Sequence, residues 1–201
     1  MAPETIISLP LPRPTEVPLD VAMSRRQSVR EYTDDPLTSA QLATLLWAAQ
    51  GESDRAGRRT VPSAGATRPL EVYAVVGRVE GLEPGIYRYR AHEHDLKRIA
   101  AGDRRAALGR AALEQACVTR APASIVISAV YSRTTQGYGE RGVRYVHMEA
   151  GHSGQNIHLQ AAAMELGTVM VGAFDDDAVA RIMALSPDEK PLYIVPIGKP
   201  A

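Results

Sequence analysis

Two separate segments of the chain hold residue types suited to binding an anionic, planar ligand. The segment SRRQSVREY at 24–32 contains Arg25, Arg26 and Arg30, and guanidinium groups bind phosphate oxygens through paired hydrogen bonds. The segment RRTVPSAGATRPLEVY at 58–73 has small side chains over Ser63–Ala66, which let the backbone approach a flat ligand closely. Together the two segments predict a cofactor with a phosphate group and a planar ring.

Each segment also has an explanation that involves no ligand. The arginines of 24–32 would form a solvated basic face before a helix. The PSAGA stretch at 62–66 would be an ordinary loop between two elements. Neither segment alone decides between the two explanations, so the rest of the chain has to.

The elements that position these segments follow from local sequence patterns. Residues 38–50 predict a helix with Thr38 as N-cap, Gln41 completing a capping box and Gly51 ending it. The apolar, β-branched run at 124–131 predicts a buried central strand. The other predicted elements are strands at 70–77, 85–90, 95–100, 168–172 and 192–198 and helices at 104–117, 144–166 and 175–185. We therefore predict an α+β fold, with a mixed or antiparallel central sheet and helices on its faces.

The predicted helix at 144–166 raises the question of a metal site. Glu149 and His152 lie one turn apart on it, which would suit two ligands. His147 and His158 point away from that face, however, and a metal needs three or four converging groups. We therefore expect no metal.

The stretch GYGERG at 137–142 matches the glycine pattern of a dinucleotide-binding loop. That loop requires a strand immediately before the first glycine and an apolar helix start after it. Here the predicted strand ends several residues earlier, and Glu140 and Arg141 lie inside the match. We expect no Rossmann site, so a nicotinamide would have to dock on the face of the planar cofactor instead.

Composition indicates one globular unit without nucleic-acid binding. The 201 residues include 23 basic and 23 acidic side chains, so the chain lacks the cationic excess on which nucleic-acid affinity depends. Cys117 is the single cysteine, which excludes an internal disulfide and favours the reducing cytoplasm. Residues 1–22 are rich in proline and lack an apolar run long enough for export or a membrane span. We expect an extended N-terminal arm over 1–22, able to wrap a neighbouring subunit, and one domain over 23–201.

Five stretches, taken in order, carry a family resemblance. They are RRQSVREYTDDPLTSAQLATLLWAAQG at 25–51, TVPSAGATRPLEVY at 60–73, YVHMEAGHSGQNIHLQAAAMELGT at 145–168, VGAFDDDAVARIMAL at 171–185 and PLYIVPIGKP at 191–200. In this combination the chain resembles the FMN-dependent nitroreductase superfamily, and within it the SagB-type dehydrogenase branch. The similarity covers nearly the whole chain and implies a nitroreductase-like fold.

The resemblance implies a set of FMN-binding residues. Arg26, Gln27 and Ser28 match residues that contact the FMN phosphate and ribityl chain. Arg30 matches a basic residue beside the pyrimidine side of the ring, where a fixed cation stabilises the reduced flavin. The loop residues that match the family's flavin-contacting loop are Pro62, Ser63, Ala64, Gly65 and Ala66. The residues that match the segment facing flavin N5 are Gly172 and Ala173.

The resemblance also implies a domain-swapped homodimer, with the helix at 144–166 at its centre and the PSAGA loop supplied by the partner. The small residues at 150–154 of that helix favour the same arrangement, because they permit close approach of another helix. The alternative that involves no dimer is a core helix of a monomer.

Three departures from the family pattern limit the comparison. Ala66 stands where many nitroreductases have asparagine. The sequence ends at residue 201 without a basic C-terminal extension, which leaves Lys199 as the nearby substitute for a phosphate ligand. SagB-type azoline dehydrogenases carry a Lys-Tyr pair for proton abstraction, whereas this chain has Gly137 followed by Tyr138. A lone tyrosine, with an ordinary pKa near 10, is a poor base at neutral pH.

Three functions are compatible with these observations. The first is an FMN-dependent oxidoreductase that passes hydride to or from a small organic substrate in a ping-pong cycle, with NAD(P)H as a candidate electron donor. The second is an azoline dehydrogenase acting in peptide maturation, against which Gly137 counts. The third is a flavin-binding protein without catalytic activity. The second function could be tested by the substitution Gly137→Lys. That substitution would fail if residue 137 required a positive φ, which lysine rarely adopts.

Overall fold

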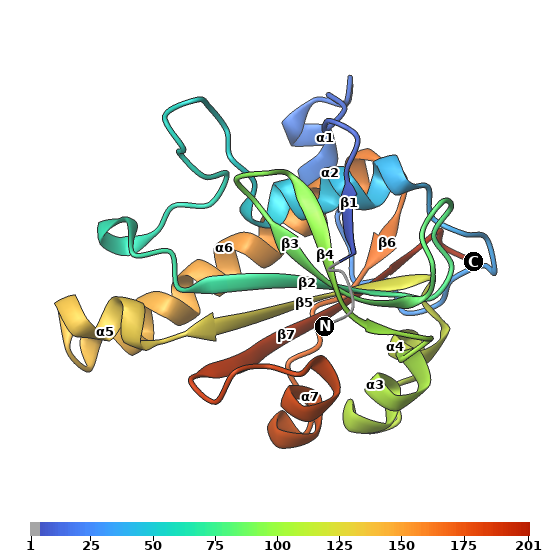
Figure 1. The fold of residues 1–201 in the computed structure, drawn as a ribbon. Helices are drawn as coiled ribbons and strands as arrows, with labels where there is room; N and C mark the ends of the chain where they lie inside the picture. The colour runs from blue at the N-terminus through green and yellow to red at the C-terminus, as the bar shows by residue number, and fades with distance from the viewer. Residues whose placement is uncertain (1–4) are drawn as a thin grey trace.

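The computed structural model describes residues 5–201 as a seven-stranded sheet with helices on both faces (Figure 1). The strand order is β1-β4-β3-β2-β5-β7-β6, and every pair of named strands is antiparallel. The strands are β1 Ile6–Ser8, β2 Leu70–Val76, β3 Gly85–Arg90, β4 Asp95–Ala101, β5 Ala123–Val130, β6 Gly167–Thr168 and β7 Glu189–Gly198. The helices are α1 Leu19–Arg25, α2 Ser39–Gln50, the 3-10 turn η1 Ala64–Ala66, α3 Arg105–Ala111, α4 Ala116–Arg120, α5 Ser132–Tyr138, α6 Arg141–Ala163 and α7 Asp176–Met183. The predicted α+β class is confirmed.

The sheet separates two apolar cores. Helices α2 and α6 cover one face, and α3, α4 and α7 cover the other (Figure 1). Strand β5 lies between β2 and β7, and all eight of its residues are buried, as the apolar run at 124–131 predicted. Alternate residues of β5 enter opposite cores: Ile125 packs with α2 and α6, and Val126 packs with the other layer.

Helix α2 begins and ends as predicted. The Thr38 hydroxyl accepts the Gln41 N–H at 3.1 Å, and the Gln41 side chain accepts the Thr38 N–H at 2.9 Å, which completes the capping box. Gly51 ends the helix. Polar side chains of α6 then satisfy the last carbonyls of α2: Ser153 donates to Ala49 O at 2.8 Å and Asn156 to Ala48 O at 3.2 Å.

These bonds change the explanation for the small residues at 150–154. Ala150, Ser153 and Gly154 are buried against the rest of the same chain, and a Cβ on Gly154 would lie 2.3 Å from Met170 Cε. Only Gly151 and His152 of this stretch are exposed, and a Cβ on Gly151 would meet nothing within 4 Å. Most of the small residues therefore serve packing within one chain, and Gly151 is left on the outer face of α6.

Several segments differ from the predictions. The helix predicted at 104–117 is two helices, α3 and α4, because Leu113 and Glu114 between them have φ of 57° and 59°, outside the helical range. The turn folds α4 back so that Gly109 lies against Thr119, where a Cβ would be 1.9 Å from the hydroxyl oxygen. Helices α1 and α5 were not predicted, and α6 begins three residues before the predicted start at 144.

The N-terminal segment contributes to the fold described here. Strand β1 pairs with β4, with Ile7 opposite Leu96, so this part of the predicted arm lies on its own chain's sheet. The predicted boundary at residue 22 falls inside α1. The first four residues of the predicted arm lie outside the described residues.

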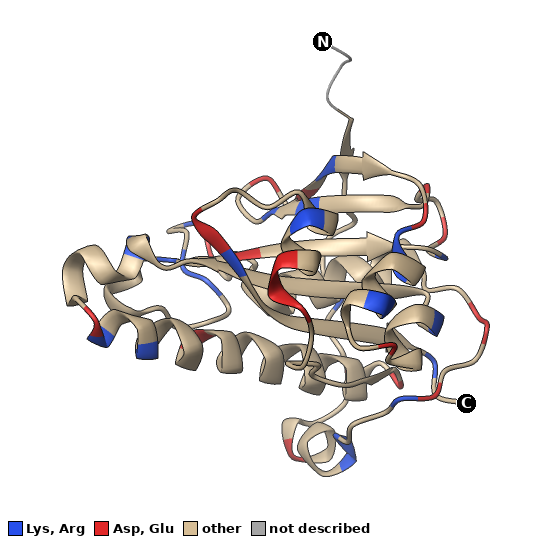
Figure 2. Ribbon diagram, turned by 90° about the horizontal axis from the view of Figure 1, so that it is seen from below, with Lys and Arg blue, Asp and Glu red and all other residues tan. Residues whose placement is uncertain are grey.

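The surface carries charges of both signs. Figure 2 shows basic and acidic residues interspersed on the side of the molecule seen from below. Within residues 5–201, no helix combines the length and apolar character that crossing a membrane requires.

Candidate functional site

Residues 24–32, which we call the arginine-serine segment, begin at the end of α1 and run beside β6. The Val29 N–H donates to Thr168 O at 2.9 Å, and Ser28 forms a parallel bridge with Thr168. Val29 also packs on Gly167, where a Cβ would lie 2.6 Å from Val29 Cγ1. Gly167, the first residue of β6, therefore lets the segment lie close to the sheet.

A cavity of about 330 Å³ lies beside this segment. Its lining residues include Arg25, Gln27, His158 and Thr168. His158 is 6% exposed, and its Nδ1 atom has no hydrogen-bond partner within residues 5–201. Burial lowers the pKa of His158, and the nearby positive charge of Arg26 lowers it further. The cavity thus offers a guanidinium, an amide and an unpaired imidazole nitrogen to an anionic group.

The other predicted phosphate residues point in different directions. Arg26 is half-buried, and its effect on His158 places its charge on the α6 side of the sheet. The charge of Arg30 instead acts on Tyr32 and Cys117, and Cys117 belongs to the core on the opposite face. The segment therefore crosses the sheet edge, with the Arg26 charge on one side and the Arg30 charge on the other.

The PSAGA loop is a tight turn with its tip exposed. Gly65 and Ala66 have φ of 56° and 53°, and both are exposed together with Pro62. Ser63 is oriented inward: its hydroxyl accepts the Arg68 N–H at 2.9 Å. The exposed edge of the loop is consequently backbone and small side chains, which suits contact with a flat group.

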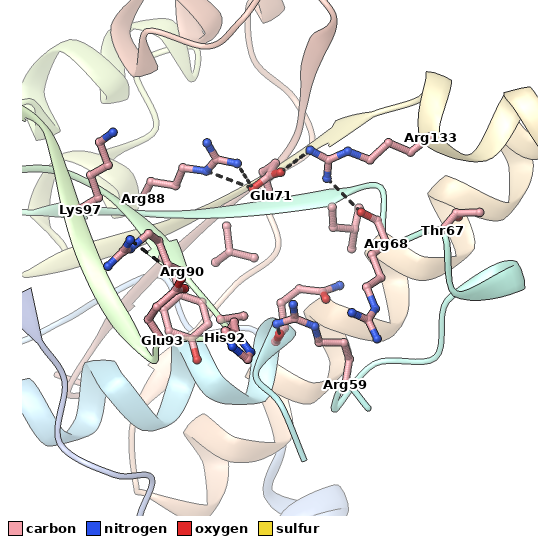
Figure 3. Close-up of a pocket in the computed structure, with 15 residues that line it drawn as sticks. Arg59, Thr67, Arg68, Glu71, Arg88, Arg90, His92, Glu93, Lys97 and Arg133 are labelled. Carbon is pink, nitrogen blue, oxygen red and sulfur yellow. Dashed lines mark hydrogen bonds and ion pairs between the residues drawn. The ribbon is translucent and has the colours of Figure 1, made fainter. Parts of the chain in front are cut away.

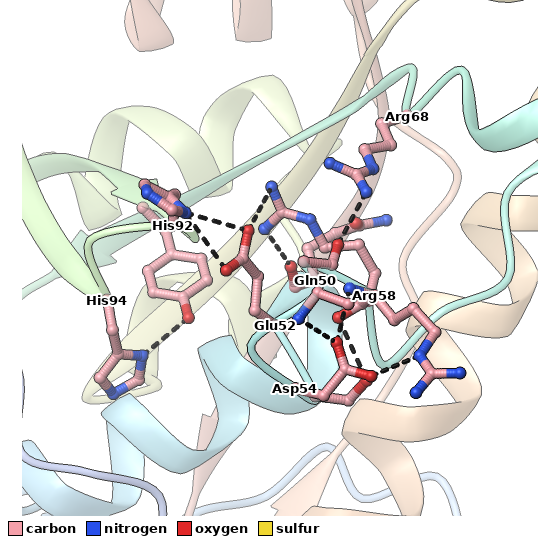
Figure 4. A network of polar contacts seen from close by, with 12 residues as sticks. Gln50, Glu52, Asp54, Arg58, Arg68, His92 and His94 are labelled. Carbon is pink, nitrogen blue, oxygen red and sulfur yellow. Dashed lines mark hydrogen bonds and ion pairs between the residues drawn. The ribbon is translucent and has the colours of Figure 1, made fainter.

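A polar network holds the chain that leads into this loop (Figure 4). Arg58 bonds Asp54, and Arg68 donates to Gly57 O at 2.7 Å. His92 contacts Glu52 at 3.2 Å, which ties the start of the segment to the turn after β3. These bonds fix the loop without using its exposed edge.

Glu149 is a buried carboxyl beneath the PSAGA loop. It is 3% exposed, forms a hydrogen bond with the Ser63 side chain, and accepts from Gln50 Nε2 at 3.4 Å. Burial raises its pKa above the ordinary value, although the two hydrogen bonds oppose the shift. In the sequence, Glu149 is a candidate only for a metal ligand. Its buried position can be inferred from helix periodicity, because Glu149 falls between Val146 and Ser153 on the face of α6 that packs on the core.

Glu149→Gln is expected to reduce the loss of stability as pH rises. Because the folded-state pKa of this carboxyl is raised, its contribution to stability is present at low pH and is lost as pH rises through that pKa. Glutamine does not titrate, so urea unfolding from pH 5 to 8 should show the variant gaining stability relative to wild type. Glu140→Gln, at the exposed start of α6, controls for the loss of one negative charge. Parallel pH profiles for wild type and Glu149→Gln would contradict the assignment.

Tyr138 lies at the end of α5 and contacts the PSAGA loop. Its ring packs edge-on against Tyr145 with centroids 5.2 Å apart, and a Cβ on Gly65 would lie 2.6 Å from its hydroxyl. Gly65 is thus required both by its positive φ and by this contact. The structure brings together two predicted site residues that are far apart in sequence, Tyr138 and Gly65.

Gly137 does not have the positive φ that would strain another residue at this position. It lies inside α5 without a positive φ, and a Cβ there would meet nothing within 4 Å. The positive φ, 56°, belongs to Gly139. The GYGERG stretch spans the junction of α5 and α6, while β5 ends at Val130. The strand that a dinucleotide loop requires is therefore not adjacent to it.

The remaining predicted residues lie near the C-terminal strands. Gly172 and Ala173 are exposed; Gly172 lies beside the Tyr193 ring, and Ala173 O accepts from Gln115 at 3.0 Å. Lys199 pairs with Asp35 at 3.1 Å and does not line the cavity beside Arg25. To reach a phosphate in that cavity, Lys199 would have to leave Asp35.

A metal site finds no support in the described geometry. Glu149 is buried and His152 is exposed, so the two face different surroundings. His147 contacts the Tyr131 hydroxyl at 2.6 Å. Across residues 5–201 there is no group of three or more histidine, cysteine or acidic side chains arranged to hold a metal.

The two predicted ligand-binding segments meet α6 at different places. The PSAGA loop contacts Glu149, whereas the arginine-serine segment lies by His158. Nine residues of helix separate these contacts, about 14 Å at 1.5 Å per residue. Within one chain, the segments do not converge on one small site.

Comparison with known proteins identifies the family. The sequence profile of the nitroreductase family matches residues 23–199, and the chain therefore belongs to that family, whose members are oxidoreductases. A protein of Methanocaldococcus jannaschii named as a nitroreductase is 45% identical over 96% of both chains. The crystal structure of a nitroreductase-type protein from Ralstonia eutropha superposes with a TM-score of 0.85 and 31% identity, covering 98% of this chain and 90% of that one.

Proteins of a trifolitoxin operon and of a microcin synthetase are also similar. The trifolitoxin operon protein TfxC of Rhizobium leguminosarum is 26% identical over 90% of this chain, which spans about half of that relative's length (54%). A chain of the E. coli microcin synthetase McbBCD complex, solved with truncated pro-MccB17 bound, superposes with a TM-score of 0.79 and 25% identity. That match covers 88% of this chain and 70% of the other. The predicted resemblance to the SagB-type branch is thus accompanied by relatives of that kind.

Proposed function

We propose that the chain is an FMN-dependent oxidoreductase that works as a homodimer and takes electrons from NAD(P)H. The observation that carries the proposal is the cavity beside the arginine-serine segment, where His158 Nδ1 is buried without a partner. An unpaired buried polar atom is costly, and a phosphate or ribityl group would satisfy it. When bound, FMN supplies hydride transfer through its N5 atom.

The residues around this cavity fit an FMN phosphate and ribityl chain. Arg25 and Gln27 line the cavity, and Arg26 places a second positive charge near His158. Hydrogen bonds from a guanidinium group to a phosphate are charge-assisted and stronger than neutral hydrogen bonds. Arg30, directed to the other side of the sheet edge, would hold a fixed cation beside the ring and stabilise negative charge there. The exposed backbone at Gly172 would lie against the ring from the C-terminal strands.

A second chain would complete the site. The PSAGA loop and the arginine-serine segment contact α6 about 14 Å apart by helix rise, so the two do not meet at one point of a single chain. If α6 packs against its counterpart in a dimer, the loop of one chain can approach the segment of the other. The exposed edge of the loop, with Gly65 and Ala66, would then face the ring.

The first test is the identity of the bound cofactor. Purified protein should be yellow, and denaturation should release FMN and no FAD. Loaded protein should oxidise NAD(P)H in the presence of a nitroaromatic compound. A colourless protein that takes up no FMN would refute the proposal.

Arg26→Ala should weaken FMN binding by about tenfold to a hundredfold, because a charge-assisted hydrogen bond contributes about 1.5–3 kcal/mol. Fluorescence titration of apoprotein with FMN measures this. The same variant should raise the pKa of His158 in the apoprotein, since the Arg26 charge lowers it. Arg110→Ala, at an exposed position of α3, is the control for loss of one positive charge. Unchanged FMN affinity would mean that the phosphate lies elsewhere.

Oxidation of azoline rings in peptides is the second candidate. Similarity to the trifolitoxin and microcin proteins favours it. The glycine at 137, in place of the lysine of the Lys-Tyr pair, counts against it. We therefore rank it below reduction of small molecules; activity of the wild-type protein on a thiazoline peptide distinguishes the two.

A further inference from the structure

The PSAGA loop and the end of α2 rest on a row of polar side chains along α6. Asn156 donates to Thr60 O at 3.1 Å, and Ser153 donates to Ala49 O at 2.8 Å. Glu149 lies one turn before Ser153 on the same face and is the one member of this row of three that can ionise. A glutamine at 149 could form neutral hydrogen bonds without the cost of burying an acid, so packing alone does not explain the carboxyl.

Glu149 lies between two neutral hydrogen-bond partners. It accepts from Gln50 Nε2 at 3.4 Å and forms a hydrogen bond with the Ser63 side chain. Glu149 and Gln50 are both buried, whereas Ser63 is half-buried, next to the exposed edge of the PSAGA loop. Gln50 also lines an open cavity of about 560 Å³, which gives protons a route between solvent and the buried carboxyl (Figure 3).

The surroundings of Glu149 favour its neutral form. The nearest cations bond to its two partners: Arg59 donates to the carbonyl oxygen of residue 50 at 2.9 Å, and the Arg68 N–H donates to the hydroxyl of residue 63 at 2.9 Å. On α6 the titratable neighbours are Tyr145, which is half-buried, and His152, which is exposed, and the β2 side chains on this face are apolar. Burial outweighs the two hydrogen bonds and raises the pKa of Glu149.

The hydrogen bonds of Ser63 depend on whether Glu149 carries a proton. A hydroxyl has one donor hydrogen and two acceptor lone pairs, and the Arg68 N–H occupies one lone pair. When Glu149 is ionised, the Ser63 hydroxyl donates its single hydrogen inward to the carboxylate. When Glu149 is protonated, the carboxylic acid donates to the second lone pair, and the Ser63 hydrogen is released to point elsewhere.

We propose that Glu149 is a positioning residue that controls whether the Ser63 hydroxyl can donate a hydrogen bond at the exposed edge of the PSAGA loop. The acceptor would be a carbonyl oxygen or ring nitrogen of the planar cofactor, so this use of the donor rests on the proposed function. The proton that Glu149 binds comes from solvent and returns to it, and no bond of the cofactor is formed or broken. Glu149 thus acts on the cofactor through Ser63, without touching it.

The coupling between the two side chains can be tested on apoprotein. The pKa of Glu149 is measured by NMR of protein carrying ¹³C-labelled glutamate. Ser63→Ala should raise this pKa further, because the hydrogen bond from Ser63 lowers it. Gln50→Met, which keeps the side-chain length and leaves the loop unchanged, should raise it for the same reason. An unchanged pKa in Ser63→Ala would overturn the proposal, whether or not the protein binds FMN.

The effect on the cofactor is tested by fluorescence titration with FMN between pH 5 and 8. Glu149→Gln keeps the neutral arrangement at every pH, because its amide donates to Ser63 as the carboxylic acid does. Wild type and Glu149→Gln should bind FMN equally at low pH. As pH rises through the raised pKa, wild type should become weaker than the variant by up to about tenfold, the effect of one hydrogen bond.

Two controls isolate the contribution of Ser63. The FMN phosphate and His158 titrate in both proteins, so the ratio of the two dissociation constants at each pH removes their effect. Glu140→Gln, at the exposed start of α6, should bind as wild type throughout. In a Ser63→Ala background, Glu149→Gln should no longer change the affinity. A ratio that is constant with pH, or a Glu149→Gln effect that persists without Ser63, would overturn the proposal. Failure of every variant to bind FMN would refute the proposed function, and the apoprotein measurement would still decide the coupling.

Discussion

Gly137→Lys is expected to give the chain an azoline-oxidising activity that the wild type lacks. Wild-type protein should reduce nitroaromatics with NAD(P)H and leave a thiazoline peptide unchanged. A positioned general base typically contributes about 10²- to 10⁴-fold, so the variant should convert thiazoline to thiazole at least a hundredfold faster than wild type. Mass spectrometry detects the loss of two hydrogens from the peptide.

The structure makes this substitution a clean experiment. Residue 137 is in α5 with ordinary helical backbone and open space around it, so a lysine side chain is accommodated. Replacing an exposed helical glycine should even stabilise the helix, by up to about 1 kcal/mol. The added amine would stand next to Tyr138, whose hydroxyl reaches the PSAGA loop. The pair would therefore be formed beside the proposed flavin site.

Matched variants isolate the base. Gly137→Met has a similar length and no amine, and it should remain inactive on thiazoline. Gly137→Lys combined with Tyr138→Phe should lose most of the gained activity if the two side chains act as a pair. Robust thiazoline oxidation by wild type would contradict the reasoning most directly, because it would show that another residue supplies the base and that the two enzyme functions were ranked wrongly.

The sequence predicted the elements whose signals are local. The capping box at Thr38 and Gln41 lies within four residues, and the buried strand at 124–131 is a continuous β-branched run. The break at Leu113 and Glu114 was missed because neither residue type favours a positive φ. The turn brings Gly109 against Thr119, a contact that local patterns do not encode.

The candidate site was predictable in its segments and not in its geometry. Family resemblance located the arginine-serine segment and the PSAGA loop, but only the structure places Ser63 inward on Glu149 and Tyr138 against Gly65. His158 was set aside as a residue pointing away from a metal, and it lines the cavity beside Arg25. Such contacts join residues many positions apart, and one sequence carries no record of them.

Gly151→Leu is expected to abolish dimerisation and flavin binding together while leaving the chain folded. Gly151 is exposed on the outer face of α6, next to Met148, which is 50% exposed. A leucine there adds no clash within the chain and improves helix propensity by up to about 1 kcal/mol. If two α6 helices pack through this face, the added side chain would hold them apart. Light scattering at micromolar concentration and flavin content per chain give the two readouts.

Gly154→Leu, the variant that the small-residue stretch first suggests, would mislead. Its Cβ would lie 2.3 Å from Met170 Cε in the same chain, and overpacking of this kind costs about 1–3 kcal/mol. Loss of flavin would then report damage to the monomer. Gly151→Ala is the matched control, because it improves helix propensity without adding bulk, and it should remain a flavin-loaded dimer. A Gly151→Leu protein that stays dimeric with full flavin content would place the interface on another face. In a shared site, the PSAGA loop and the arginine-serine segment come from different chains. A Gly151→Leu monomer that retains FMN would therefore show that one chain is sufficient to bind the cofactor.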